Sequence, residues 1–419
     1  MQLVGYNKRM VDLKFIREYP EKVKRGSASK NVEIDVDKIL QIDDKIKNLN
    51  VEVQTLRAER NVVSKERNIE RGREIKQQLD GLEPGLTKLQ EELAGLLSQI
   101  PAIPKDDVKV GKNDTENDVV RQVGEITKFN FKPLDHLELG EKLGIIDVER
   151  AAKVSGARFY YLKNEGALLE MAILQYAMDK LRVKGFTPII PPTMISKQTM
   201  KAMGYMENGG SEDMFHIEGE DKVLVGTAEQ SIVPMHKDEL MDVKSLPLRY
   251  IGYSSSFRRE AGSYGKDTRG ILRVHEFHKI EMVSFVMEGQ DDQEHEFLRE
   301  TEEEFFQELK IPYQLIKMCT GDLGFPAIRK YDLEAWVPTQ EKYREVTSTS
   351  TTGDFQARRL NIKYKDGEEK KYVNILNGTA FAIGRTLIAI LENYQQEDGS
   401  VIIPEVLQKY TGFDRISPK

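Results

Sequence analysis

Two series of apolar residues repeat at heptad spacing in the first quarter of the chain. One covers residues 39–63, with Arg60 filling one position, and the other covers residues 75–100; in both the steps alternate between three and four residues. Such steps average about 3.5, the period at which a helix presents a continuous apolar seam to another helix. Only a short polar stretch, residues 68–72, separates the series, which favours an antiparallel connection. The sequence therefore predicts an antiparallel α-helical coiled-coil hairpin over about residues 36–100.

Prolines mark where this hairpin is interrupted and where it ends. Pro84 and Gly85 lie inside the second series. A proline in a helix interior lacks the backbone donor, so we expect the second helix to kink there or to start anew. Residues 100–114 are Pro-rich and then polar, as in a linker. We therefore predict an N-terminal domain over residues 1–110 and a second domain over residues 111–419.

The cations of the hairpin gather around its predicted connection. Residues 57–76 carry seven Lys and Arg against four Glu, whereas residues 77–100 carry one Lys against four acids. A positive tip suits a lever that holds a phosphate backbone. An ordinary solvated coiled coil or a dimerisation stalk also accounts for the charges, and this stretch alone favours those two. The candidate RNA-binding residues are Arg57, Arg60, Lys65, Arg67, Arg71 and Arg73.

Residues 249–282 have a Gly-rich, charged middle between two apolar, alternating runs. The alternation predicts two antiparallel strands joined by a long loop. Residues 258–273 hold five cations against two acids, and Arg offers a planar, two-pronged fork to phosphate oxygens. In one strand, Arg273, Phe277 and Glu281 would share a face and offer a cation, a ring and a carboxylate. Alone, such a hairpin is more commonly an exposed loop with a solvated tip.

Three further clusters combine carboxylates, hydroxyls and small residues. They are Thr227-Ala228-Glu229, Glu345-Val346-Thr347-Ser348, and the stretch from Asn377-Gly378-Thr379 to Gly384-Arg385. A carboxylate and a hydroxyl three residues apart suit Mg²⁺ bridging phosphates, and residues 377–385 predict a small-residue turn before a helix at 386–394. Each cluster also has a plain explanation: a helix N-cap, a strand end or a packing turn. Together with the Arg-rich loop they supply what adenylation needs.

After the linker, the sequence predicts a mixture of helices and strands. Expected helices are residues 168–184 and 291–310, and expected strands are residues 221–227, 332–337, 343–347 and 372–376. Residues 185–195 read as a strand broken by three prolines, which confines it to a sheet edge or an interface. Antiparallel strands interleaved with helices predict an α+β fold rather than a doubly wound sheet.

Familiar site motifs are absent or imperfect. In the Gly-Lys segment of the charged loop, Glu260 stands where a P-loop needs its first glycine, and Asp267 where it needs Ser or Thr. His275 and His278 are three residues apart on a predicted strand, whereas a zinc helix spaces them four apart. Cys319 is the only cysteine, which rules out an internal disulfide and a Cys-cluster metal site.

Composition limits the location and the partners. The 419 residues have a net charge of −7, so no global positive field attracts nucleic acid and local patches must hold it. No apolar run approaches the roughly 18 residues of a membrane helix, and the start lacks the pattern of a signal peptide. We expect a cytoplasmic protein with no membrane partner, in which residues 1–9 are an extension if Met10 is the true start.

These motifs together resemble class II aminoacyl-tRNA synthetases, and among them the bacterial-type seryl-tRNA synthetases. The resemblance to the second class signature rests on residues 257–260, 273–277 and Glu281; to the first, a dimer-interface motif, on residues 185–192; and to the third on Gly384-Arg385. The seryl-type features are residues 227–229, 320–327 (TGDLGFPA), 354–359 (DFQARR) and 391–395 (LENYQ), and the hairpin is similar to the tRNA-binding arm of that family.

The resemblance implies a two-step reaction on an α+β class II domain. The carboxylate of L-serine attacks the α-phosphate of ATP and releases pyrophosphate, and the terminal ribose hydroxyl of tRNA(Ser) then takes the seryl group. The family also charges tRNA(Sec). Its members are homodimers, and Mg²⁺ accompanies ATP.

By motif match, the resemblance implies roles for the nucleotide residues. Arg258 would hold the α-phosphate, Glu260 the adenine edge and Arg273 the terminal phosphates, while Phe277 and Arg385 would sandwich the base. The full ATP-binding set is Arg258, Arg259, Glu260, Arg273, Val274, Phe277, Glu345, Val346, Thr347, Ser348 and Arg385, of which Arg258, Arg273 and Arg385 are the catalytic residues.

The same match implies the serine and metal residues. Glu345 and Ser348 would hold Mg²⁺. The serine-binding set is Thr227, Ala228, Glu229, Glu281 and Thr379. Buried acids that meet an ammonium and a hydroxyl would favour serine over alanine, because without the hydroxyl a polar group stays unpaired.

Two other functions compete with this interpretation. One is a non-catalytic dimeric module that only holds RNA, against which the intact charged set argues. The other is an aminoacyl ligase that acts on a carrier protein, against which the long arm argues, because such an acceptor gives the arm no partner.

Overall fold

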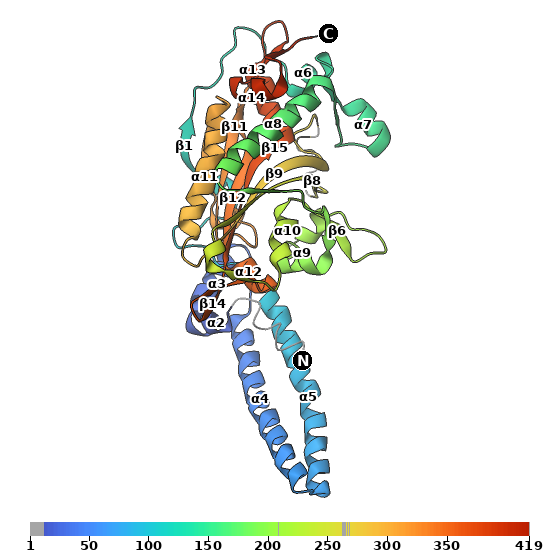
Figure 1. The fold of residues 1–419 in the computed structure, drawn as a ribbon, viewed down its shortest axis with the longest axis vertical. Coiled ribbons are helices and arrows are strands. Elements are labelled where there is room, and N and C mark those ends of the chain that lie inside the picture. Colours follow the sequence, from blue (N-terminus) through green and yellow to red (C-terminus); the bar gives the residue numbers. More distant parts are fainter. Residues whose placement is uncertain (1–11, 208, 262–264, 266, 268, 419) are drawn as a thin grey trace. The chain divides into compact units, whose positions relative to one another are not determined.

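The computed structural model describes residues 12–207, 209–261, 265, 267 and 269–418 (Figure 1). It divides into two compact units, Met1–Ile103 and Pro104–Lys419. Among the described residues, no helix has both the length and the apolar character needed to cross a membrane.

In the described residues of the first unit, all regular secondary structure is helical. Its helices are α2 (Leu13–Glu18), α3 (Pro20–Ser29), α4 (Val36–Lys65) and α5 (Ile69–Ser98). The predicted hairpin is confirmed: α4 and α5 pack along the heptad seam, and residues such as Ile39, Val53, Ile75 and Leu93 are buried there. Short helices α2 and α3 add Ile16 and Val23 to the same core.

The connection between α4 and α5 is shorter than predicted. Residues 69–72 belong to α5, because the Asn68 side chain caps that helix by accepting from the backbone N–H of Arg71. The expectation that a new helix starts near Pro84 is wrong, since α5 runs through it. Pro84 is exposed, so the hydrogen bond it removes lies away from the apolar seam.

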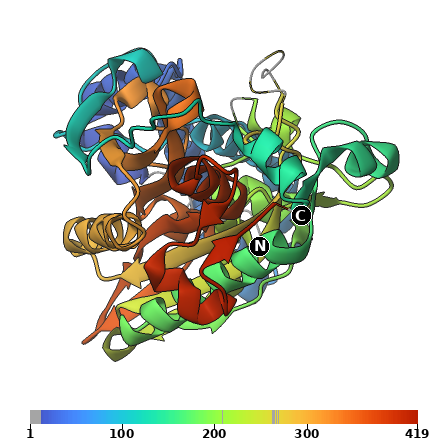
Figure 2. The same cartoon turned by 90° about the horizontal axis from the view of Figure 1, so that it is seen from above.

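The second unit is built on one eight-stranded sheet (Figure 2). Its order is β1 (Asp118–Val123), β10 (Tyr313–Lys317), β11 (Arg329–Val337), β12 (Lys342–Gly353), β15 (Asn374–Ala382), β9 (Glu276–Val286), β8 (Leu248–Phe257) and β4 (Thr187–Ile189). All neighbours are antiparallel except β4 and β8. The Pro-rich strand β4 lies at the sheet edge as predicted, and the α+β fold is confirmed.

Helices and smaller sheets complete this unit. The helices are α6 (His136–Lys142), α7 (Val148–Ser155), α8 (Asn164–Val183), α9 (Lys197–Met203), α10 (Glu229–Ile232), α11 (Asp291–Glu308), α12 (Phe355–Leu360), α13 (Ile383–Tyr394) and α14 (Glu405–Thr411). The small sheets are β14-β13-β7 (Glu369–Tyr372, Lys363–Asp366, Leu240–Asp242), β16-β17 (Val401–Ile402, Arg415–Ile416), β2-β3 (Ile146–Asp147, Tyr161–Leu162) and β5-β6 (Met194–Ser196, Lys222–Leu224). Helices α8, α11 and α13 share the main core with the large sheet (Figure 1).

The predicted turn over residues 377–385 is wrong, because residues 377–382 belong to the central strand β15. Gly378 is small for a packing reason: a Cβ there would lie 2.9 Å from Glu302 Oε1 and 3.3 Å from Met282 Cε. A side chain from α11 thus approaches the strand closely.

The strand predicted to contain Arg273 begins later, at Glu276. Ile271, Leu272 and Val274 are all buried, at 1%, 7% and 5% exposure. Burial of two successive residues does not fit a strand that alternates between a covered and an open face. The shared-face prediction therefore holds for Phe277 and Glu281 but not for Arg273.

Candidate active site

Three buried side chains meet on the two central strands β9 and β15. Glu281 pairs with Thr379 across these strands, so both project from one face of the sheet. The Thr379 hydroxyl donates to Glu281 Oε2 at 3.2 Å, and Lys279 Nζ lies 2.7 Å from the same oxygen. Glu281 and Thr379, two of the predicted residues, thus form one polar cluster together with Lys279.

A second buried acid lies at the start of α10. Glu229 is 2% exposed, and the Tyr205 hydroxyl donates to its Oε1. Burial and the nearby charge of Glu281 raise the pKa of Glu229 to about 7. In the described part of the chain, Glu229 Oε2 and the buried Thr227 hydroxyl find no hydrogen-bond partner. Unpaired buried acceptors are costly, so these two oxygens suit a ligand with an ammonium and other donors.

The predicted nucleotide residues form two cation–carboxylate pairs. Arg273 Nη1 donates to Glu260 Oε2 at 2.7 Å, across the charged loop. Arg385 Nη1 lies 3.0 Å from Glu345 Oε2 and donates to the Glu345 carbonyl at 3.1 Å. Although burial opposes its ionisation, the charges of Arg385 and Lys330 lower the pKa of Glu345 to about 2.

Arg258 lies beside Phe277 and close enough to Glu229 and Glu345 for its charge to affect both. Its guanidinium stands 5.3 Å from the centre of the Phe277 ring. Its charge offsets part of the rise in the pKa of Glu229 and contributes to the lowered pKa of Glu345. In this structure Arg258, rather than Arg385, covers the Phe277 ring. Among the remaining predicted residues, Arg259 is exposed, and Val274 and Ala228 are buried.

A β-bulge brings Glu345 and Ser348 onto one face of β12. Residues three apart in a regular strand face opposite sides, but Val346 is an extra residue in the pairing with β11. Glu345 and Ser348 therefore lie opposite Glu334 and Asp332, which are two apart and share a face. Val346 is buried in the core on the helical side of the sheet, and the Thr347 hydroxyl donates to Glu302 of α11 at 2.8 Å. Neither therefore faces the site.

The donor set around this bulge fits a hard divalent cation. Burial raises the pKa of Asp332 to about 7, and Lys330 Nζ lies 3.4 Å from its Oδ1. The described residues hold no group of three His, Cys, Asp or Glu side chains suited to a metal. One or two carboxylates completed by substrate phosphates are the usual protein ligands of Mg²⁺. The site thus fits a cation that arrives with a nucleotide.

The candidate RNA-binding cations of the arm fall into two groups. Arg57 pairs with Glu83 at 2.8 Å, and Arg71 with Glu59 at 2.7 Å. The other four are exposed at or near the connection between α4 and α5, and no ion pair to a described residue is found for them. They are Arg60, Lys65, Arg67 and Arg73. These four cations are the ones open to a phosphate backbone.

The sequence prediction missed Lys279, Tyr205 and Asp332. Lys279 alternates with Phe277 and Glu281 along β9, so the period-two rule that linked those two residues also includes it. Tyr205 and Asp332 carry no such signal, because each meets the site through a residue distant in sequence: Glu229 for Tyr205 and Ser348 for Asp332.

The arrangement can bind two ligands side by side. Guanidinium groups and a ring offer a phosphate and base site, while buried acids and hydroxyls offer a site for a small polar ligand bearing an ammonium. Arg258 stands between them. Such a site catalyses a transfer by positioning and charge stabilisation, without covalent participation by the protein.

Comparisons with known proteins cover both units. Residues 10–104 match the seryl-tRNA synthetase N-terminal domain, and residues 214–394 match the tRNA synthetase class II core domain (G, H, P, S and T). The serine–tRNA ligase of Treponema denticola is 42% identical over 97% of this chain and 100% of that protein. The crystal structure of seryl-tRNA synthetase from Pyrococcus horikoshii complexed with ATP superposes with a TM-score of 0.92 at 41% identity, over 98% of this chain and 100% of that one. The cytoplasmic serine–tRNA ligase from Naegleria fowleri in complex with AMP gives a TM-score of 0.89 at 33% identity, over 98% and 99%.

Proposed function

This chain belongs to the seryl-tRNA synthetase family of class II ligases, and we propose on that basis that it activates L-serine with ATP and charges tRNA(Ser). In the first step a serine carboxylate oxygen bonds to the α-phosphorus, the bond to the β-phosphate oxygen breaks, and pyrophosphate leaves. In the second step the terminal ribose hydroxyl of tRNA bonds to the seryl carbonyl carbon and AMP leaves. The observation that carries the proposal is the pair of buried oxygens without a partner in the described structure, Glu229 Oε2 and the Thr227 hydroxyl, close to Arg258.

Each ligand has a natural place in this geometry. The serine ammonium meets Glu229 Oε2 and the Thr227 hydroxyl, which lack partners in the described structure. The serine hydroxyl meets the cluster of Glu281 and Thr379. Arg258, whose charge acts on both Glu229 and Glu345, then faces the α-phosphate, where negative charge accumulates in the transition state.

The nucleotide occupies the other side of Arg258. The base lies against Phe277 with Arg385 on its opposite face, Glu260 receives the adenine amino group, and Arg273 reaches the terminal phosphates. Glu345 and Ser348 would hold Mg²⁺, which would neutralise charge on the phosphates. Asp332 lies opposite Ser348 in the strand pairing. Its carboxylate would accept a hydrogen bond from the Ser348 hydroxyl while the oxygen of that hydroxyl binds the cation.

The N-terminal unit presents the acceptor. We propose residues 1–110 as the tRNA-binding domain and residues 111–419 as the catalytic domain. The exposed cations on the tRNA backbone would be Arg60, Lys65, Arg67 and Arg73. Because charged tRNA is consumed in protein synthesis, the cytoplasm is the proposed location.

A homodimer is the proposed assembly. Apolar side chains stay exposed on and beside α8 and β4, among them Val183 at 90% and Ile190 at 83%. These positions surround the segment that resembles the first class signature, so a second copy of the chain would cover them. Sedimentation of the purified protein at the mass of a dimer is the expected result.

Pyrophosphate exchange tests the function as a whole. The protein is incubated with ATP, labelled pyrophosphate and each amino acid in turn, with and without tRNA. Exchange with serine alone, followed by charging of tRNA(Ser), is the expected pattern. A non-catalytic RNA-binding module would give no exchange, and a carrier-protein ligase would give exchange without charging.

Serine binding should depend on pH through Glu229. Its pKa of about 7 in the free protein means that lowering the pH through 7 protonates the carboxylate and removes its attraction for the serine ammonium. We expect the KM for serine in exchange to rise about tenfold between pH 8 and pH 6, while the KM for ATP changes far less. A serine KM that stays level across this range would contradict the assignment.

Tyr205→Phe provides a matched variant for this profile. The Tyr205 hydroxyl donates to Glu229 and favours its charged form. Without that donor the pKa of Glu229 rises, so the midpoint of the serine KM profile should move to higher pH. Glu229→Gln has no charge to lose, so its raised KM should not vary with pH.

A further inference from the structure

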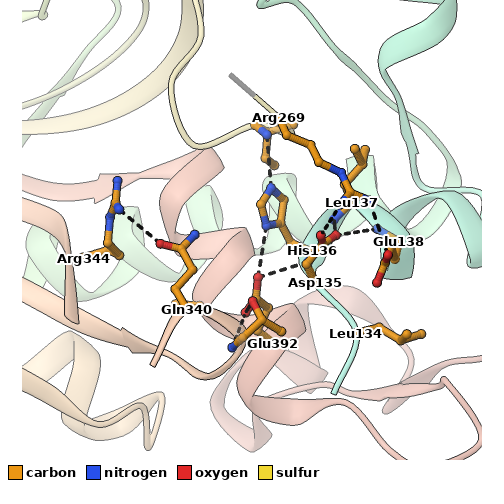
Figure 3. A network of polar contacts seen from close by, with 12 residues as sticks. Leu134, Asp135, His136, Leu137, Glu138, Arg269, Gln340, Arg344 and Glu392 are labelled. Carbon is orange, nitrogen blue, oxygen red and sulfur yellow. Dashed lines mark hydrogen bonds and ion pairs between the residues drawn. The ribbon is translucent and has the colours of Figure 1, made fainter. Parts of the chain in front are cut away.

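A buried histidine outside the predicted site joins three separate segments of the second unit (Figure 3). His136, the first residue of α6, is 5% exposed. Its Nδ1 lies 3.1 Å from Glu392 Oε1 on α13, and its Nε2 accepts from the backbone N–H of Ile271 at 3.2 Å. Ile271 stands two residues before Arg273, at the exit of the charged loop.

The partners of His136 admit one arrangement of its ring. The fully buried Glu392 carboxylate also accepts from the backbone N–H of His136 at 3.1 Å, and from the backbone N–H of Thr339 at 3.2 Å. Glu392 is therefore an acceptor, so the proton must be on Nδ1 of His136. The Ile271 N–H is a donor, so Nε2 must offer a lone pair. The ring is a neutral bridge with a defined direction.

The backbone of the charged loop at Gly270 lies in close contact with the His136 ring. Gly270 has φ +77°, and a Cβ there would lie 2.0 Å from His136 Nε2, so a side chain at this position would displace the ring or the loop. Arg269 pairs with Asp135 at 3.1 Å and with Glu138 at 3.4 Å, on either side of His136 along α6 (Figure 3). Residues 269–271 are therefore fixed at three successive points.

We propose that His136 is a positioning residue for ATP, which fixes the exit of the charged loop so that Arg273 is held at the terminal phosphates before the nucleotide arrives. The proposal rests on the function proposed above, because that function assigns Arg273 to ATP. Arg273 is already paired with Glu260 at 2.7 Å on the entry side of the loop. With Ile271 held by His136 on the exit side, its backbone has little freedom, and small displacements of a positioning group are costly to catalysis.

Two substitutions distinguish the role of His136 Nδ1, which contacts Glu392, from that of Nε2, which accepts from Ile271. His136→Asn keeps a donor near the Nδ1 position for Glu392 but removes the acceptor for Ile271. His136→Gln places an oxygen near the Nε2 position and keeps that acceptor. We expect His136→Asn to raise the KM for ATP in pyrophosphate exchange by about three- to tenfold, the effect of one lost hydrogen bond. The KM for serine should stay within about twofold, and His136→Gln should restore most of the ATP affinity.

Hydrogen–deuterium exchange of the Ile271 amide gives a readout that does not depend on activity. In the free full-length protein, His136→Asn should speed exchange at Ile271 while leaving the amides of β9 protected. Unchanged exchange at Ile271, or equal ATP defects in the Asn and Gln variants, would overturn the proposal. If the wild-type protein showed no serine-dependent ATP–pyrophosphate exchange, the proposed function would be refuted instead. The deuterium exchange rate of the Ile271 amide would still show whether His136 holds the loop.

Gly270→Ala approaches the same contact from the loop and decides the matter if His136→Asn does not fold. Its added Cβ separates the Ile271 amide from the ring, so the same ATP-specific rise in KM and faster amide exchange are expected. A folded Gly270→Ala protein with the wild-type KM for ATP would overturn the proposal.

Discussion

Replacing Arg258 with alanine is expected to lower serine-dependent ATP–pyrophosphate exchange by at least about a hundred- to a thousandfold, the cost of removing a group that stabilises transition-state charge. The side chain stands over Phe277 at 5.3 Å, and its charge acts on Glu229 and on Glu345. It is thus close both to Glu229 of the proposed serine site and to Glu345 of the proposed metal site, and the proposed function assigns it to the α-phosphate. The exchange rate at saturating ATP and serine is the measurement.

The fold should survive this substitution. Arg258 is only partly buried, so its thermal unfolding midpoint should lie close to that of the wild type. Arg150→Ala is the matched control, because the Arg150 side chain is 71% exposed on α7 and its partner Asp147 keeps a second cation, Lys163, at 2.7 Å. Near-normal exchange in a folded Arg258→Ala protein would remove the central group from the proposed mechanism.

Removing the outer part of the arm should separate the two reaction steps. Deleting residues 50–85 and closing the shortened helices with a glycine-containing turn removes the tip but keeps the base of the hairpin. The base must stay, because Arg17 donates to Asp43 there at 2.7 Å. We expect pyrophosphate exchange to stay within about twofold of the wild type, while kcat/KM for tRNA charging falls at least about a hundredfold because phosphate contacts are lost.

A charge variant tests the same role without changing the length of the arm. Neutralising the four exposed tip cations should weaken charging and reduce its dependence on salt; they are Arg60, Lys65, Arg67 and Arg73. Lys45 and Lys88 lie nearer the base, where both act on Glu92, and neutralising them provides the control. Unchanged charging in the tip variant would favour a plain stalk.

Local periodicity was enough to predict the arm, whereas its details depend on single contacts. The heptad spacing alone predicts two antiparallel helices, and α4 and α5 follow it. Where the connection lies depends on one cap, the Asn68 side chain on the Arg71 amide. Pro84 is tolerated inside α5 because it lies on the solvent-exposed face of that helix. The spacing of the apolar residues does not show which proline positions are exposed.

In the second unit, the errors arise where packing overrides local pattern. Gly378 was interpreted as part of a turn, but it is small because Glu302 approaches from α11. The segment before β9 was interpreted as strand, but Ile271 and Leu272 are both buried. Tyr205 and Asp332 join the site through residues far along the chain, and no local pattern connects such pairs.

The bulge at Val346 has a consequence for how distant relatives are judged. Glu345 and Ser348, which are three residues apart, lie on the same face of β12 only because Val346 is an extra residue in the pairing with β11. In a regular strand without a bulge, a Glu and a Ser three residues apart would face opposite sides of the sheet. A Glu-x-Ser spacing would then be needed to place both side chains on one face. Whether a homologue can place both side chains at the proposed metal site therefore depends on the hydrogen-bond register of this strand pair as well as on the spacing of the two residues.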